Sequence, residues 1–119
     1  MKYLFLLLLL CSFTYTNVPK HVGLKGVKVL DAATQQFAGK NIGYYVKFLN
    51  NSKKPVDAIR WKATLMNNFD EVKGVRYGEW QSGNIISPIE PNDETEDIER
   101  IWVSGATKVK IVITEVSFI

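Results

Sequence analysis

The chain has 119 residues, of which 46% are hydrophobic and 23% are charged, and its formal net charge is +3. This length allows one domain with a single buried core but leaves little room for a large active-site cavity as well. The 15 lysines and arginines are spread along the chain instead of being gathered in one stretch, which argues against nucleic-acid binding.

The N-terminal segment has the pattern of a cleavable signal peptide. Lys2 supplies a positive charge, a long apolar run follows it, and Thr14 and Thr16 offer small residues at a spacing that suits a signal peptidase. We therefore expect a signal peptide over residues 1–16. The mature domain would cover residues 17–119 and would be secreted or located in the periplasm or cell envelope.

Cys11, the only cysteine, lies inside the apolar run. After cleavage the mature domain would contain no cysteine and would depend on its core without disulfides. Lipid attachment to Cys11 is an alternative, although leucine precedes it where lipoprotein signals place a small residue. The run falls short of a transmembrane helix, which needs about 20 apolar residues.

Beyond residue 17, apolar and polar residues alternate in short segments that Gly, Pro, Asn and Asp interrupt, which predicts an antiparallel β-sandwich. We expect about seven strands, as in an immunoglobulin-like sandwich. One is a short edge strand within residues 81–91, where prolines limit pairing. Residues 31–40 are expected to form a loop, and turns are expected at residues 50–55 and 67–70. The other strands are expected at residues 24–30, 41–49, 56–66, 72–80, 95–103 and 107–118.

Residues 56–66 have the most regular strand pattern. Their apolar side chains share one face with Trp61, and a slip of one residue would bury Arg60 and Lys62, so the register is well specified. Residues 107–118 are apolar on both faces, which indicates a central strand or one that crosses between layers. The expected faces of this last strand are Val109, Ile111 and Ile113 on one side, and Val112, Val116 and Phe118 on the other.

Residues 44–74 combine a strand that ends in Asn50-Asn51-Ser52, a Pro55-Val56 step, a second strand and a Phe69-Asp70 turn. This order resembles the bacterial extracytoplasmic sandwich domains of the FxLYD kind. The later phrase Ile89-Glu90-Pro91-Asn92-Asp93 is similar to the turn that follows in those domains, with asparagine where glycine is usual. The resemblance covers roughly half of the mature chain. It implies an immunoglobulin-like fold, an envelope location and no enzymatic activity.

The sequence has no residue pattern typical of an enzyme. His21 is the only histidine, and no Gly-x-Ser-x-Gly motif is present, so neither a zinc site nor a Ser-His-Asp triad is expected. We expect His21 to be a mobile surface residue. Asp93, Glu94 and Asp97 are candidate calcium ligands, but they lack the usual spacing, and we expect a solvated acidic surface there. The prediction is a non-catalytic domain without a metal or cofactor.

Three tryptophans raise the question of a binding surface. Trp61 and Trp102 are flanked by apolar patterns and are expected in the core. Trp80 has polar neighbours and is the tryptophan for which exposure is most expected, and Tyr77 and Tyr45 could join it as a candidate binding surface.

We interpret the chain as an exported binding domain whose partner is another envelope or secreted protein. The loops to consider first are residues 50–55, 67–71 and 91–96, and the first of these also contains a glycosylation sequon at Asn50. The alternative function is a carbohydrate-binding module in which Trp80 stacks on a sugar together with Tyr77 or Tyr45.

Overall fold

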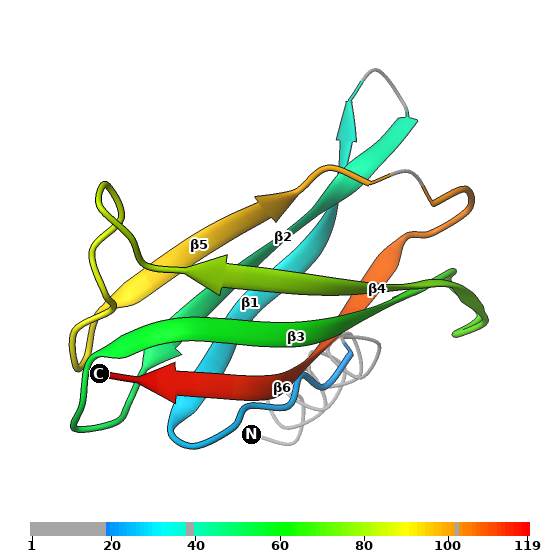
Figure 1. The fold of residues 1–119 in the computed structure, drawn as a ribbon. Coiled ribbons are helices and arrows are strands. Elements are labelled where there is room, and N and C mark those ends of the chain that lie inside the picture. Colours follow the sequence, from blue (N-terminus) through cyan, green and yellow to red (C-terminus); the bar gives the residue numbers. More distant parts are fainter. Residues whose placement is uncertain (1–18, 38–39, 102) are drawn as a thin grey trace, which may run out of the picture.

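The computed structural model describes residues 19–37, 40–101 and 103–119. The expected signal peptide, Cys11 and Trp102 lie outside these residues. Over the described ranges the chain is all-β, with six strands in two antiparallel sheets and no helix (Figure 1). The strands are β1 (Val27–Phe37), β2 (Lys40–Asn50), β3 (Val56–Met66), β4 (Val72–Gln81), β5 (Glu94–Glu99) and β6 (Lys108–Phe118).

The two sheets pack face to face in a β-sandwich-like arrangement. One sheet has the strand order β1-β2-β5 and the other has the order β4-β3-β6. Figure 1 shows β4 and β5 along one side of the molecule and β1 and β6 along the other. Each sheet turns one apolar face inward, and these two faces form a single core.

The centre of the core is built on β3, whose predicted bounds and buried face are both confirmed. Trp61 is fully buried, and its Nε1 donates a hydrogen bond of 2.8 Å to the Tyr44 hydroxyl of the opposite sheet. The Phe48 ring lies 5.1 Å from the Trp61 ring, centroid to centroid. Gly78 is the register partner of Trp61 on β4, and a Cβ atom there would lie 2.1 Å from Trp61 Cε2. The indole therefore requires glycine at position 78.

A β-bulge in β6 changes which side chains face the core. Arg60 pairs with Glu115, but the next residue, Trp61, pairs with Ile113, so that Thr114 is the extra residue. Because a bulge interrupts the alternation of side chains, Val116 returns to the core face and is 6% exposed. The expectation that Val116 lies on the opposite face from Ile113 is therefore wrong.

The expected loop at residues 31–40 is also wrong, because β1 continues to Phe37 and β2 begins at Lys40. Antiparallel pairing with β2 extends along this segment, from Ala32 opposite Val46 to Phe37 opposite Lys40. A register shift between Val29 and Asp31 leaves Leu30 as an extra residue, so that Val29 pairs with Phe48 of β2 and Asp31 pairs with Lys47. Pairing to a long neighbouring strand thus overrides the weak local preference of small polar residues.

The expected edge strand within residues 81–91 does not form. A single bridge joins Ile89 to Val56, with backbone N···O distances of 2.9 and 3.0 Å. Pro88 and Pro91 flank this bridge and lack the N–H groups that a longer ladder would need. The strand expected at residues 95–103 is shorter than predicted, because β5 ends at Glu99.

The N-terminal segment covers the outer edge of β6. Val22 N donates to Ile111 O and Ile113 N donates to Val22 O, each at 2.9 Å. His21 adds a side-chain contact, because its Nδ1 accepts a hydrogen bond of 3.0 Å from Ile111 N. Within the described residues, β4 and β5 have no strand partner at their outer edges. The backbone edge of β6 is therefore paired with the N-terminal segment, whereas the outer backbone edges of β4 and β5 are unpaired with any other strand of the described residues.

Candidate functional site

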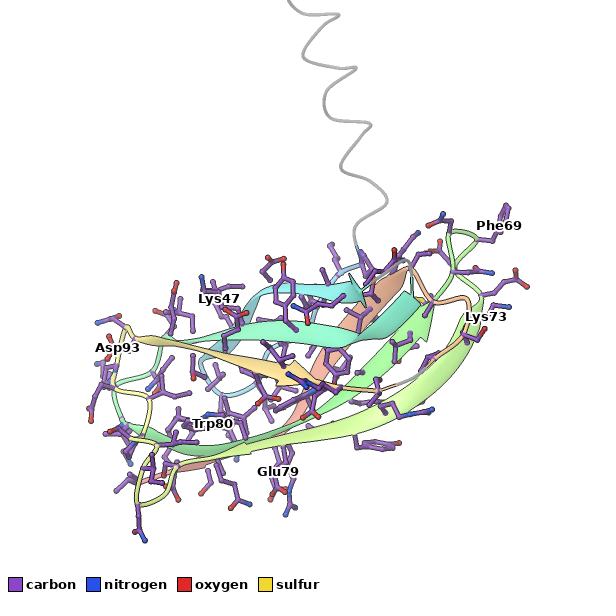
Figure 2. All side chains as sticks on the ribbon, turned by 90° about the horizontal axis from the view of Figure 1, so that it is seen from above. Lys47, Phe69, Lys73, Glu79, Trp80 and Asp93 are labelled. Atoms are coloured by element: carbon purple, nitrogen blue, oxygen red, sulfur yellow. The ribbon has the colours of Figure 1, made fainter. Side chains whose placement is uncertain are left out.

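The three aromatic residues expected to form a binding surface lie apart. Trp80 is 6% exposed and lies between the two sheets, whereas its neighbour Glu79 points away from them (Figure 2). Tyr77 is 77% exposed on the opposite face of β4 from Trp80. Tyr45 lies on the outer face of the other sheet, and its hydroxyl donates a hydrogen bond of 2.6 Å to Asp31 Oδ2. The polar neighbours of Trp80 mark the other face of the strand and not an exposed indole.

The loop at residues 50–55 is held by a buried side chain. Asn50 is fully buried, and its Nδ2 donates hydrogen bonds of 2.8 Å to both Lys54 O and Ile89 O. Its Oδ1 accepts hydrogen bonds from Ser52 N at 3.0 Å and Ser52 Oγ at 2.6 Å. The amide of the glycosylation sequon is therefore occupied inside the fold, and the motif has a structural role at this end of the sandwich.

The loop that leads into β5 is tied to the same residue. Asn50 N donates to Asp93 O at 3.0 Å, and Asn92 N donates to Asn50 O at 2.7 Å. Asn92 has a φ angle of 68°, a left-handed conformation that asparagine tolerates better than most residues other than glycine. The main-chain contacts of both loops thus stabilise the sandwich.

The loop at residues 67–71, at the opposite end of the molecule, presents an aromatic side chain to solvent. Phe69 is 84% exposed, and Figure 2 shows it at the end far from Asp93, pointing away from the sheets. Asn67 organises the loop, because its Oδ1 accepts from Phe69 N at 2.9 Å and from Glu71 N at 3.0 Å. Its Nδ2 donates to Glu71 Oε1 at 2.9 Å. One side chain therefore fixes the backbone on both sides of the exposed ring.

Two further contacts attach this loop to the start of β6. Thr107 Oγ1 donates to Asn68 Oδ1, and Lys108 Nζ donates to Asp70 Oδ1, both at 2.8 Å. Asp70 has a φ angle of 60°, a conformation that the surrounding contacts must maintain. We call the ring of Phe69 and the loop at residues 67–71 the Phe69 tip. These contacts hold the backbone of the Phe69 tip in one conformation.

A second exposed apolar group lies in the segment between β4 and Ile89. Ile85 is 97% exposed and Ile86 is 51% exposed. The hydrogen bonds of this segment lie near its base, where Ser82 Oγ donates to Asp57 Oδ1 and Gly83 N donates to Ile86 O at 2.8 Å. Ile85 thus provides an exposed apolar residue for comparison with Phe69.

The outer face of the β4-β3-β6 sheet carries an ion-pair network beside a shallow hollow of about 140 Å³. Arg60 Nε lies 3.1 Å from Glu79 Oε1, and Arg60 Nη1 lies 2.9 Å from Glu115 Oε2. Hydrogen bonds from Gln81 and Arg60 lower the pKa of Glu79. The Arg60 guanidinium is already paired with two carboxylates. Its positive charge is therefore compensated and gives the hollow little attraction for an anionic ligand.

The remaining candidate groups have structural contacts. Burial lowers the pKa of His21, which is partly buried and hydrogen-bonded to Ile111, so the expectation of a mobile surface residue is wrong. Glu94 pairs with Lys47 at 3.5 Å on the outer face, whereas Asp97 is on the inward face of β5. In the described ranges, no group of three or more His, Cys, Asp or Glu side chains is placed to hold a metal ion.

The described part of the chain contains no helix with the length and apolar character needed to cross a membrane. The sequence interpretation named the loop at residues 67–71 but missed the exposed ring of Phe69. The available signal was a large apolar residue inside a turn, between Asn68 and Asp70.

The chain matches no protein-family model, and no curated protein or solved structure is significantly similar to it.

Proposed function

We propose that the chain is a non-catalytic binding domain that engages a protein partner through the Phe69 tip. The observation that carries this proposal is an aromatic ring 84% exposed on a backbone that Asn67, Thr107 and Lys108 hold in one conformation. An exposed ring on an unconstrained loop would lose conformational entropy on binding, whereas a pre-organised loop loses less.

The shape of the tip favours a concave partner. A single protruding ring buries most of its surface only when it enters a pocket, and aromatic residues in such pockets are frequent hot spots of protein interfaces. Val72, which is 59% exposed at the start of β4, would add apolar area at the rim of such a contact.

The proposal includes the finer features expected from the sequence. We infer an immunoglobulin-like sandwich, related to the domains of the FxLYD kind, that is exported after removal of residues 1–16 and works in the envelope or outside the cell. The antiparallel sheets β1-β2-β5 and β4-β3-β6 support the fold part of this proposal. The Asn50 contacts give a physical reason for the Asn50-Asn51-Ser52 motif on which the resemblance rests.

The carbohydrate-binding alternative gains no support. It required an exposed aromatic platform, but Trp80 is buried and Tyr77 and Tyr45 lie on opposite outer faces of the sandwich. A sugar-stacking platform needs its rings on one accessible surface.

Site-specific photo-cross-linking tests the proposal. The full chain carrying benzoylphenylalanine at position 69 should form one dominant cross-link to a protein in its native host, whereas the same probe at position 85 should not. Phe69→Ser should then weaken binding of the purified, identified partner about 30-fold, as expected for an aromatic hot spot of about 2 kcal/mol. Ile85→Ser is the matched control and should leave that affinity unchanged. Equal cross-linking at both positions, or unchanged affinity in Phe69→Ser, would exclude the Phe69 tip as the binding site.

A further inference from the structure

The edge strand β5 places polar side chains on the inner face of its sheet. Thr95, Asp97 and Glu99 stand opposite Phe48, Val46 and Tyr44 of β2, and these three β2 residues are fully or almost fully buried. Residues directly opposite each other in an antiparallel pair share a face. Two carboxyl groups, those of Asp97 and Glu99, therefore lie on the inner face of the sheet, beside the buried side chains of β2.

One oxygen of this pair has no partner. Asp97 Oδ2 is buried and accepts no hydrogen bond within the described part of the structure. A buried acceptor without a donor costs about 1–3 kcal/mol, so such an atom calls for an explanation. Glu99 is the next inward-facing residue along β5, so its carboxyl group lies on the same side of the strand as that of Asp97.

The groups that face the pair from neighbouring strands do not neutralise it. On β2 the facing titratable group is Tyr44, whose hydroxyl accepts a hydrogen bond from Trp61. Across the open side, the inward positions of β4 include Gly78 and Trp80, which carry no charge, and Arg76, whose Nη1 donates to Val75 O at 2.9 Å. The pair thus has no ion-pair partner among the salt bridges that the described residues form.

We propose that Asp97 and Glu99 share one proton and that this proton holds β5 against β2, so that attachment of this edge strand is sensitive to pH. A proton on Glu99 makes its carboxyl group a donor, and Asp97 Oδ2 is the buried acceptor that lacks one. When the proton leaves, two carboxylates face the same apolar surface, and their repulsion and loss of hydration favour movement of β5 into solvent.

The direction of the effect follows from the neighbours of Glu99. Burial, then the hydrogen bond with Asp97 and its charge, raise the pKa of Glu99 from 4.5 to about 7. Because the folded pKa lies above the unfolded one, the stabilising contribution is complete below pH 4.5 and is lost as the pH rises through about 7. The β2–β5 contact should therefore be tighter at pH 5.5 than at pH 8.5, which are test conditions on either side of that midpoint.

Two measurements on the full chain test the proposal. A carboxyl-carbon NMR titration should give Glu99 a midpoint near 7, and Asp97→Asn should move that midpoint down. Hydrogen-exchange protection of β5 amides, corrected for the intrinsic effect of pH, should fall about tenfold between pH 5.5 and 8.5. Glu99→Gln, which keeps a donor beside Asp97, should remove this dependence.

The control is Glu96→Gln, which changes an exposed carboxyl group on the same strand and should behave as the unmodified chain does. A Glu99 midpoint near 4.5, or protection that changes with pH equally in Glu99→Gln, would overturn the proposal. If Glu99→Gln fails to fold, the titration of Glu99 in the unmodified chain still decides the question.

Discussion

The Trp61 indole of β3 and the Tyr44 hydroxyl of β2 join the two sheets through a hydrogen bond of 2.8 Å inside the core. Both residues are almost completely buried. Burial also raises the pKa of Tyr44 to about 12, so the hydroxyl stays neutral at ordinary pH. A neutral acceptor thus satisfies the one polar atom of the largest core side chain.

Removal of the Tyr44 hydroxyl should leave the indole N–H without a partner. Tyr44→Phe is therefore expected to destabilise the fold by about 1–3 kcal/mol, measured by urea unfolding. Tyr45→Phe is the control, because its hydroxyl bonds to Asp31 on the outer face. A similar loss in both variants would show that the inter-sheet bond makes no special contribution.

Glycine at position 78 makes room for the indole. Gly78→Ala should cost about 1–3 kcal/mol or more, because its Cβ atom would overlap the Trp61 ring. Gly83→Ala, where nothing lies within 4 Å of the added atom, should change stability little. Thermal unfolding of the two variants provides the comparison, and equal melting temperatures would contradict the packing argument.

The buried Asn50 amide should be essential to the loop end of the sandwich. Asn50→Ala is expected to lower the free energy of unfolding by about 3 kcal/mol, since several buried or partly buried hydrogen bonds are lost at once. The neighbouring Asn51 has an exposed side chain, so Asn51→Ala should cost less than about 0.5 kcal/mol. Comparable losses in urea unfolding would show that the network is not specific to Asn50.

Contact of the N-terminal segment with β6 should weaken in acid. Burial is the largest cause that lowers the pKa of His21, so the folded state favours the neutral ring whose Nδ1 accepts from Ile111. The stabilising contribution is present above pH 6.5 and is lost as the pH falls toward the lowered pKa of His21. The corrected hydrogen-exchange protection of Ile111 should therefore decrease as the pH falls below 6.5.

His21→Asn offers the matched variant, because an amide oxygen accepts the same bond without titrating in this range. It should keep Ile111 protected across the whole pH range. Protection that falls equally in both proteins would assign the effect to another group.

The strand β3 and the turns around it followed from local pattern alone. Its inward apolar residues, Ile59 to Leu65, alternate strictly with polar ones, and both flanking turns contain Asn with Asp, Ser or Pro. A register slip would bury Arg60 and Lys62, so this strand had one stable arrangement whatever its partners.

Other elements depended on which strand lies beside them. The extension of β1 came from pairing with β2, and the return of Val116 to the core came from the bulge at Thr114. The burial of Trp80 followed from its register opposite Ile59, which the polar residues beside it did not reveal. Pairing and bulges join residues far apart in the chain, so local alternation cannot specify them.

The sequence by itself determined the all-β character, the inward face of β3 and the position of the main turns, because these follow from a period of two residues and from turn chemistry. Only the tertiary structure decided that Phe69 is presented to solvent and that Asp97 and Glu99 lie on the inner face of their sheet. The reason is that the exposure of a side chain depends on contacts between segments far apart in the sequence, and these contacts form only when the two sheets pack together.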